Sequence, residues 1–227
     1  SAPGDTAFSV QSIGIFGGTF DPVHAGHLAL ASRVRDVFAL DSLMIVPAPQ
    51  PPHKRQPGAS FVHRAAMIEL ALAACPDCDR IVCSRIEENL PAPSYTIHTV
   101  EAIMRYCGGH RFALVIGMDS LADLPNWYRA KDVLALVDLI VVNRNQTQAA
   151  DIELFISRLS VGYQPVSGKK NVWQNECGRM LQVLMHFHSP YSSTTIREAL
   201  RRGEEPTGLP ETVAGYIRAH RLYGGFS

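Results

Sequence analysis

Two histidines near the start of the chain are the residues best suited to chemistry. His24 and His27 stand three residues apart, and Gly17 and Gly18 precede them after a short apolar run. At this spacing both imidazoles leave one face of a helical turn. Glycines before a helix start let an anion reach the backbone, where free N–H groups and the positive end of the helix dipole attract it. The segment therefore predicts a phosphate site with two imidazoles beside it.

Simpler or more familiar motifs fit this segment less well. An ordinary strand-to-helix turn with two solvated histidines seldom combines paired glycines, paired histidines and a third glycine, Gly26. The glycine spacing is not that of a dinucleotide-binding fingerprint, and no Gly-Lys-Ser/Thr follows as in a P-loop. A zinc site is disfavoured because no further ligand cluster is spaced to complete it.

The elements that must position this segment alternate between strands and helices. The apolar run before Gly17 predicts a strand, and an apolar-periodic helix follows from Leu28 to Phe38. Residues 143–178 are expected to be irregular, apart from a short helix at 151–159. Further strands are predicted at 42–46, 80–84, 112–117, 138–142 and 180–187, and further helices around 97–104 and at 61–74, 151–159, 195–202 and 211–223.

This alternation predicts an α/β fold. We expect a single doubly wound, Rossmann-like parallel sheet of about five or six strands, with helices on both faces and two C-terminal helices. In such sheets ligands bind at the carboxyl ends of the strands. The 227-residue chain is expected to form one domain over residues 12–227, preceded by a flexible tail at 1–11.

Composition limits the classes of function. The 21 basic and 21 acidic residues leave no net charge, which argues against a broad nucleic-acid surface, and no apolar run is long enough to span a membrane. The first residues lack the charged and apolar regions of a signal peptide. Five unevenly spaced cysteines indicate reduced thiols in a cytoplasmic protein. Cys75 and Cys78 form the only Cys-Xaa-Xaa-Cys pair, for which packing is favoured over a zinc or redox role.

Further polar groups fall near predicted strand ends and helix starts. Lys54 lies in the proline-rich loop 51–55 after the second strand, where a solvated basic loop is the alternative to a phosphate contact. Its place at the ligand edge of the sheet favours the contact. Ser94, Tyr95 and Thr96 open a helix, and Ser94 taken alone would most simply be a helix cap.

A second pair of groups follows the clearest central strand. Gly117 and Asp119 end that strand, and Trp127 and Tyr128 come soon after. Asp119 has the alternative role of capping the next helix, and Trp127 has the alternative role of a core residue. A flat ring beside a ligand edge also suits stacking on a ligand.

A hydroxyl-rich segment precedes the penultimate helix. Ser192, Ser193 and Thr194 stand there, and Arg197 follows one turn later. A capping box begun by Thr195 would account for part of this pattern. Two helix starts that face one cleft can hold a triphosphate from both ends, which is the functional alternative.

The segment 19–27, Thr-Phe-Asp-Pro-Val-His-Ala-Gly-His, closely resembles the hallmark of the nucleotidylyltransferase superfamily. Two residues depart from the family pattern: Val100 stands where the segment 94–100 usually has Leu, and Tyr191 stands where the segment 191–197 frequently has Ile. The resemblance covers about residues 12–223. Five segments are similar, in the same order, to those of the nicotinate-mononucleotide adenylyltransferases: 19–27, 51–54, 94–100, 117–128 and 191–197.

The resemblance implies transfer of AMP from ATP to nicotinate mononucleotide, giving deamido-NAD and pyrophosphate by direct in-line attack without a covalent enzyme intermediate. It implies Mg²⁺ that binds with ATP, no separate protein metal site, no nucleic-acid or membrane partner, and a monomer or small homo-oligomer. The residues that neutralise the transferring phosphate would be His24, His27, Lys54 and Arg197. The ATP-binding residues would be Gly17, Gly18, Thr19, Phe20, Gly117, Asp119, Ser192, Ser193 and Thr194. The mononucleotide-binding residues would be Ser94, Tyr95, Thr96, Trp127 and Tyr128, with backbone N–H groups near Thr96 and Tyr128 meeting the pyridine carboxylate.

Three alternatives remain open at this stage. An adenylyltransferase for another phosphorylated acceptor, nicotinamide mononucleotide or phosphopantetheine, is one; the phosphopantetheine enzymes are typically shorter and lack the Ser-Tyr-Thr and Trp elements. A nucleotide-binding regulator without turnover is the second, and intact His24 and His27 argue against it. A fragment related to class I tRNA synthetases is the third, and the neutral charge disfavours it.

Overall fold

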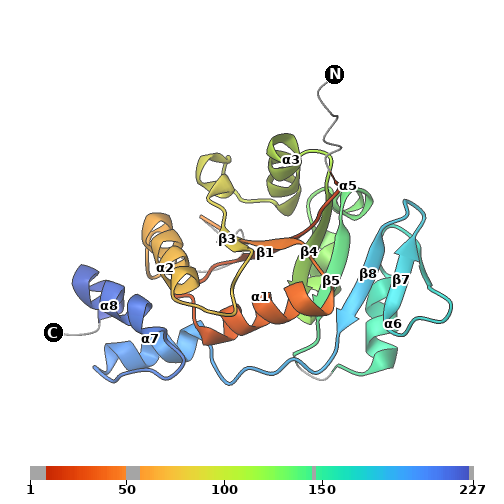
Figure 1. The fold of residues 1–227 in the computed structure, drawn as a ribbon. Helices are drawn as coiled ribbons and strands as arrows, with labels where there is room; N and C mark the ends of the chain where they lie inside the picture. The colour runs from red at the N-terminus through yellow and green to blue at the C-terminus, as the bar shows by residue number, and fades with distance from the viewer. Residues whose placement is uncertain (1–8, 50–56, 145–146, 225–227) are drawn as a thin grey trace, which may run out of the picture.

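The computed structural model describes residues 9–49, 57–144 and 147–224, and an eight-stranded sheet runs through its centre (Figure 1). The strand order is β3-β2-β1-β4-β5-β8-β7-β6. The strands are β1 (Ser12–Gly18), β2 (Ser42–Pro47), β3 (Ile81–Cys83), β4 (Arg111–Gly117), β5 (Asp138–Val142), β6 (Tyr163–Pro165), β7 (Val172–Asn175) and β8 (Met180–Leu184).

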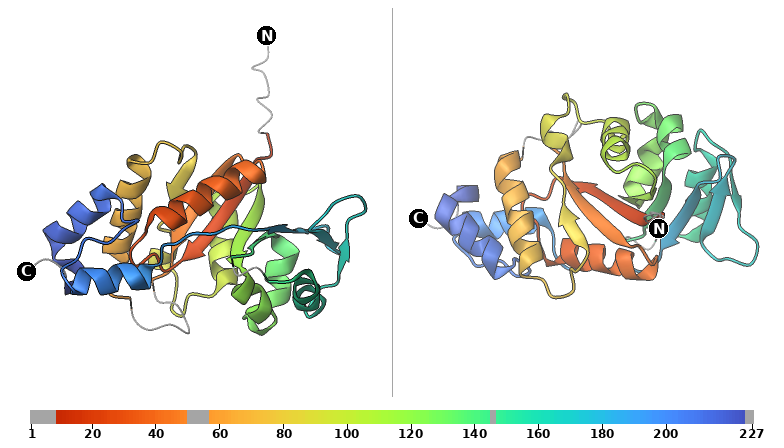
Figure 2. Two further views of the ribbon diagram at one scale, coloured as in Figure 1. Left: turned by 90° about the horizontal axis from the view of Figure 1, so that it is seen from below. Right: turned by 45° about the horizontal axis from the view of Figure 1, so that its top comes forward.

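Helices connect the strands and cover both faces of the sheet (Figure 2). Helix α1 follows β1 directly, and α7 and α8 close the chain. The α-helices are α1 (Ala25–Val37), α2 (Phe61–Ala73), α3 (Thr96–Tyr106), α4 (Met118–Asp123), α5 (Ala130–Leu136), α6 (Ala149–Ser157), α7 (Ser193–Arg201) and α8 (Glu211–His220). Short 3₁₀ helices are η1 (Ile86–Asn89), η2 (Leu124–Asn126) and η3 (Leu222–Gly224).

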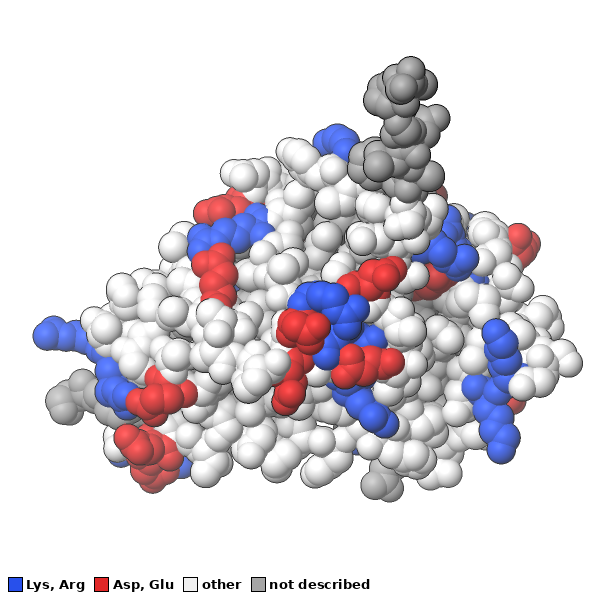
Figure 3. Space-filling model, in the orientation of Figure 1, with Lys and Arg blue, Asp and Glu red and all other residues white. Residues whose placement is uncertain are grey.

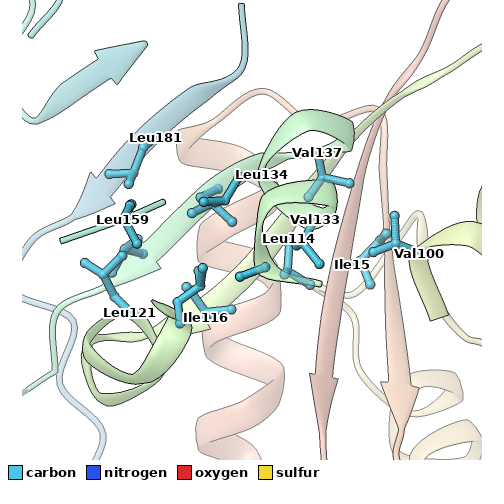
Figure 4. Packing of buried hydrophobic residues seen from close by; sticks show 14 of the residues in the cluster. Ile15, Val100, Leu114, Ile116, Leu121, Val133, Leu134, Val137, Leu159 and Leu181 are labelled. Atoms are coloured by element: carbon cyan, nitrogen blue, oxygen red, sulfur yellow. The ribbon is translucent and has the colours of Figure 1, made fainter. Parts of the chain in front are cut away.

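The two faces of the sheet carry separate hydrophobic cores. On one face, Leu114 of β4 packs in a cluster with Val100 of α3 and Val133 of α5 (Figure 4). The next residue, Val115, belongs to the cluster on the opposite face, together with residues of α1, α2, α7 and α8. Successive side chains of a strand point to opposite faces, so a strand buried on both must be apolar throughout. This explains why 112–117 reads as an unbroken apolar run, and the doubly wound α/β fold is confirmed.

The sheet is larger and less uniform than expected. Strands β1 to β5 and β8 pair in parallel, but β7 pairs antiparallel with β8, and β6 pairs antiparallel with β7. The expectation of irregular chain within 143–178 was therefore wrong for this hairpin. Strand β7 has only four residues, of which Trp173 and Asn175 are buried, and the amide of Asn175 donates to the carbonyl of Leu134 (2.9 Å).

Element ends differ by a few residues from those expected. Strand β8 ends at Leu184 rather than 187, and α6 runs two residues ahead of the predicted 151–159. Helix α8 ends at His220 because Arg221 adopts the left-handed backbone region (φ 51°), which breaks the helix before Tyr223. Residues 1–8 lie outside the described residues, so the tail and the single-domain boundary stay predictions.

The cysteines are only partly as expected. Cys75 and Cys78 are joined by a disulfide, which contradicts the expectation of reduced thiols there, whereas Cys83, Cys107 and Cys177 are free. The Cα atoms of the joined pair lie 5.4 Å apart, within the range that a disulfide requires.

Charged side chains of both signs are interspersed on the face shown in Figure 3, as the zero net charge suggests. In the three described ranges, no helix is long and apolar enough to cross a membrane.

Candidate active site

A cleft of about 1450 Å³ lies at the carboxyl ends of three neighbouring strands. Gly18 of β1, Gly117 of β4 and Val142 of β5 contribute to its walls. This is the edge at which a doubly wound sheet binds its ligands. The predicted site residues that line it are Gly17, Gly18, Thr19, Phe20, His27, Ser94, Thr96, Gly117, Asp119, Trp127, Ser193, Thr194 and Arg197.

Four predicted residues are not among those that line the cleft. His24 is buried and stacks on His27, and Ser192 is the N-cap of α7. Tyr95 and Tyr128 pack against each other, with ring centroids 4.7 Å apart. Lys54 lies outside the described residues.

The histidine pair has a fixed hydrogen-bonding pattern. Nδ1 of His24 accepts from the backbone N–H of Gly26 (3.1 Å), and Nδ1 of His27 accepts from the N–H of His24 (3.2 Å). A ring nitrogen that accepts from an N–H carries no proton, so in each neutral imidazole the proton is on Nε2. The rings stack with centroids 3.7 Å apart. The start of α1 thus holds two imidazoles whose free N–H donors are both Nε2–H.

Without ligand, both histidines have pKa values below the ordinary value for an imidazole. Burial, aided by the nearby Arg144 guanidinium, lowers the pKa of His24 to about 4. Burial lowers the pKa of His27 well below its ordinary value, and His24 and Arg144 lower it further. Neutral imidazoles can donate hydrogen bonds from Nε2, and among the described residues Arg144, Arg197 and Arg201 bring positive charge to the cleft.

Gly26 is required by a close approach between distant segments. A Cβ atom at this position would lie 2.2 Å from Oγ of Ser189 and 3.0 Å from the His24 ring. A larger residue would require the Ser189 side chain or the His24 ring to move. The first turn of α1 therefore lies close to the segment that leads into α7.

Helix α7 is attached to the 19–27 motif by side-chain hydrogen bonds. Oγ of Ser193 donates to the carbonyl of Pro22 (2.9 Å), and Nη1 of Arg197 donates to the carbonyl of Asp21 (2.7 Å). Ser192 is the N-cap, with Oγ accepting from the N–H of Thr195 (3.1 Å). The capping box begun by Thr195 is thus wrong, since the helix starts earlier. Both helix starts face the same cleft, as the sequence predicted.

The Asp21 carboxylate connects the 19–27 motif to two other parts of the chain. It accepts from the N–H groups of Gly58 (2.7 Å) and Ala59 (3.1 Å) and from the hydroxyl of Tyr223 (2.7 Å). Within the described ranges, no group of three or more His, Cys, Asp or Glu residues is arranged to hold a metal ion.

The same cleft also contains three of the residues predicted for the mononucleotide. Ser94, Thr96 and Trp127 line it together. Helix α3 has Tyr95 as its N-cap and no capping side chain, so the alternative role of Ser94 as a cap is wrong. The N-cap of α4 is Gly117, so Asp119 does not cap that helix either.

Sequence reasoning missed several residues of this site. Arg144, Glu87 and Arg201 also line the cleft, and Tyr223 reaches the site through Asp21. Arg144 follows a predicted strand end, which was a usable signal. No local pattern marks Tyr223, because its role depends on a contact across 202 positions.

The fold and the cleft define a nucleotidyltransferase: a model of the cytidylyltransferase-like family matches residues 15–199, and the chain belongs to that family. A relative from Desulfotalea psychrophila is 34% identical over 219 residues, covering 94% of this chain and 100% of the relative. A relative from Synechococcus sp. (strain JA-3-3Ab) is 37% identical over 215 residues, covering 94% and 95%. Both are named probable nicotinate-nucleotide adenylyltransferase, and the chain is a member of the nicotinate-nucleotide adenylyltransferase family.

Two solved structures of adenylyltransferases have the same fold as this chain. The Plasmodium falciparum nicotinic acid mononucleotide adenylyltransferase in complex with NaAD superposes with a TM-score of 0.70 at 15% identity, covering 95% of this chain and 98% of that chain. A putative nicotinate-nucleotide adenylyltransferase from Vibrio parahaemolyticus has a TM-score of 0.59 at 17% identity, covering 92% and 99%. At these identities the likeness establishes the fold.

Proposed function

We propose that the protein transfers the adenylyl group of ATP to nicotinate mononucleotide, giving deamido-NAD and pyrophosphate. The observation that carries the proposal is that one cleft is lined both by residues of two helix starts, His27, Ser193 and Thr194, and by Trp127, Ser94 and Thr96. Formation of a dinucleotide needs both kinds of group in one cleft, since its phosphates lie between two nucleosides. The names of the full-length relatives support the same reaction.

The reaction requires no enzyme nucleophile. An oxygen of the mononucleotide phosphate attacks the α-phosphorus of ATP, and the bond to the oxygen that bridges to the β-phosphate breaks. Pyrophosphate leaves with the electron pair of that bond. The protein then contributes positioning and charge stabilisation, as in other phosphoryl transfers.

Different residues of the site are assigned to different parts of the substrates. We assign the Nε2–H groups of His24 and His27 to the oxygens around the α-phosphorus, and Ser193, Thr194 and Arg197 to the rest of the triphosphate. The N–H groups near Gly17 and Gly18 would hold phosphate without side-chain obstruction. Lys54 stays a predicted contact. Asp119 is assigned to a ribose hydroxyl because a carboxylate at a strand end can accept from one.

Mg²⁺ is proposed to arrive with ATP and to supply charge neutralisation on the phosphates. The phosphates of ATP would be its main ligands, since the Asp21 carboxylate already accepts three hydrogen bonds from protein donors. A monomer or small homo-oligomer and a cytoplasmic location stay predictions.

We expect the acid, nicotinate mononucleotide, to be preferred over its amide. Two carboxylate oxygens can accept from both backbone N–H groups near Thr96 and Tyr128, whereas an amide would turn its NH₂ toward one of them. Sites built around such a group reject the wrong partner strongly, so kcat/KM should favour the acid by about 10²- to 10⁴-fold.

Pyrophosphate release tests these statements directly. The protein is incubated with ATP and Mg²⁺, and with nicotinate mononucleotide, nicotinamide mononucleotide, phosphopantetheine or no acceptor. Release that depends on nicotinate mononucleotide supports the proposal. Equal rates with acid and amide would contradict the assigned donors, and release with phosphopantetheine alone, or none with any acceptor, would contradict the function.

A further inference from the structure

Arg64 is a buried cation that the reaction described above does not use. It lies on α2, its exposed fraction is 0%, and it is among the largest fully buried side chains of the described chain. Arginine is seldom fully buried because removing its charge from water costs several kcal/mol, about as much as a paired carboxylate can return. Its position therefore requires an explanation.

The guanidinium of Arg64 holds three segments of backbone. Nη1 donates to the carbonyl of Thr19 (2.6 Å), in the turn that lines the cleft. Nη2 donates to the carbonyl of Pro49 (3.2 Å), and Nε donates to the carbonyl of Ala59 (3.1 Å). Pro49 and Ala59 lie on either side of residues 50–56. One planar group thus fixes the catalytic turn relative to both approaches to the segment that contains Lys54.

The charge of Arg64 has no close counter-ion. In the described part of the chain, no carboxylate lies within ion-pair distance of it. Asp21 and Glu87 act on it only at longer range, and Asp21 already accepts three hydrogen bonds from other groups. Burial lowers the pKa of Arg64, and the more distant Asp21 and Glu87 offset this effect only in part.

Arg35 shows what a buried arginine with a purely structural role looks like in the same protein. Its exposed fraction is 5%, and it donates to the carbonyl of Asp77 (3.1 Å). Unlike Arg64, it also pairs with the carboxylates of Asp36 and Asp79, each at 2.7 Å. Neither arginine lines the cleft, but Arg64 binds Thr19, which does, whereas none of the partners of Arg35 does.

We propose that Arg64 is a positioning residue for the triphosphate site. It holds the Thr19 turn and the backbone at Pro49 and Ala59 in place, and its positive charge, which is not paired with any described carboxylate at close range, favours an anionic ligand in the adjoining cleft. The inference rests on the proposed function in that the anion is taken to be ATP. Misplacing a reacting group by about 1 Å can cost roughly 100-fold in rate.

Matched substitutions at the two arginines separate positioning from stability. Arg64→Lys keeps the positive charge, but a single ammonium nitrogen cannot bind three carbonyls as the planar guanidinium does. Arg35→Lys makes the same change away from the cleft. We would measure melting temperature, ATP affinity by calorimetry without acceptor, kcat, and KM for the acceptor. We expect Arg64→Lys to weaken ATP binding about 10-fold and lower kcat about 10- to 100-fold, with acceptor KM changed less than about threefold. Arg35→Lys should lower the melting temperature about as much as Arg64→Lys does, but it should leave kcat within twofold of the wild type.

Two results would overturn the proposal. The proposal is overturned if Arg64→Lys keeps ATP affinity and kcat within twofold, or if Arg35→Lys loses as much of each for the same loss of melting temperature. Arg64→Met, which removes the charge as well, should lose more ATP affinity than Arg64→Lys; if it does not fold, the lysine pair still decides. If the wild-type protein makes no dinucleotide, the proposed function fails, and the calorimetric comparison still tests Arg64.

Discussion

Replacing His24 by Asn separates the two roles of this side chain. The Oδ1 atom of asparagine lies where Nδ1 of histidine lies, so it can accept from the N–H of Gly26 as the imidazole does at 3.1 Å. Asparagine is also among the best N-cap residues, and loss of such a cap costs about 0.5–2 kcal/mol. Nothing in the shorter side chain replaces the Nε2–H donor. The variant should therefore fold and bind ATP but lack one donor to the transferring phosphate.

The expected magnitudes follow from these contacts. His24→Asn loses the ring stacked at 3.7 Å on His27, in a site that is 5% exposed, so we expect about 1–2 kcal/mol of destabilisation. Removing one donor that is aimed at developing charge costs about 3–4 kcal/mol in the transition state, so kcat should fall about 10²- to 10³-fold. His24→Gln should show the opposite balance, because its amide N–H can approach the Nε2 position while the cap is lost.

The assay is pyrophosphate release at saturating substrates, with urea unfolding of the same samples. His24→Asn should be the more stable and less active variant, and His24→Gln the less stable and more active one. If His24→Asn keeps kcat within threefold of the wild type, the histidine is a helix cap and the assignment of its Nε2–H to the reaction is wrong.

Three other predictions concern neighbouring features. Trp127→Ala should raise KM for the mononucleotide about 5- to 150-fold, from about 1–3 kcal/mol of lost stacking, with less than about threefold change for ATP; equal effects on both substrates would make Trp127 a core residue. The ligand-free protein should lose stability as pH falls from about 6.5 toward 4, because unfolded chains take up protons that His24 and His27, with pKa values lowered by burial, do not. In urea unfolding, His24→Asn should reduce this pH dependence, and an unchanged slope would mean that His24 titrates normally. Tyr223→Phe should lower the unfolding free energy by about 1–3 kcal/mol, since it removes a buried 2.7 Å hydrogen bond to Asp21; no loss in urea unfolding would show that the bond contributes nothing.

Local patterns in the sequence were sufficient for most of the fold and much of the cleft. The glycine turn, the paired histidines and the strand at 112–117 depend on neighbours in the chain, and the structure has them where they were expected. Strands β6 and β7 were missed because each has three or four residues, and only Trp173 and Asn175 of β7 are buried.

Properties set by long-range packing were not predictable in this way. The lowered pKa values of the histidines depend on burial and on Arg144, which is 117 residues from His27 along the chain. The start of α7 was ambiguous because both Ser192 and Thr195 are competent caps, and the attachment of Ser193 to Pro22 favours the earlier start. Arg64 reads in the sequence as an ordinary helical arginine.

The hydrogen bond between Tyr223 and Asp21 also bears on when the site can form during synthesis. The two residues are 202 positions apart, and Arg197 reaches the same aspartate across 176. At about 5–20 residues per second, a ribosome needs roughly 10–40 s to proceed from one to the other. During that interval the nascent chain contains the glycine turn and the two histidines, but it does not yet contain Tyr223, which binds Asp21, or, for most of the interval, Arg197. The catalytic centre is therefore among the last parts of the molecule to be completed, and a chain released before α7 has all eight strands of the described sheet without an assembled active site.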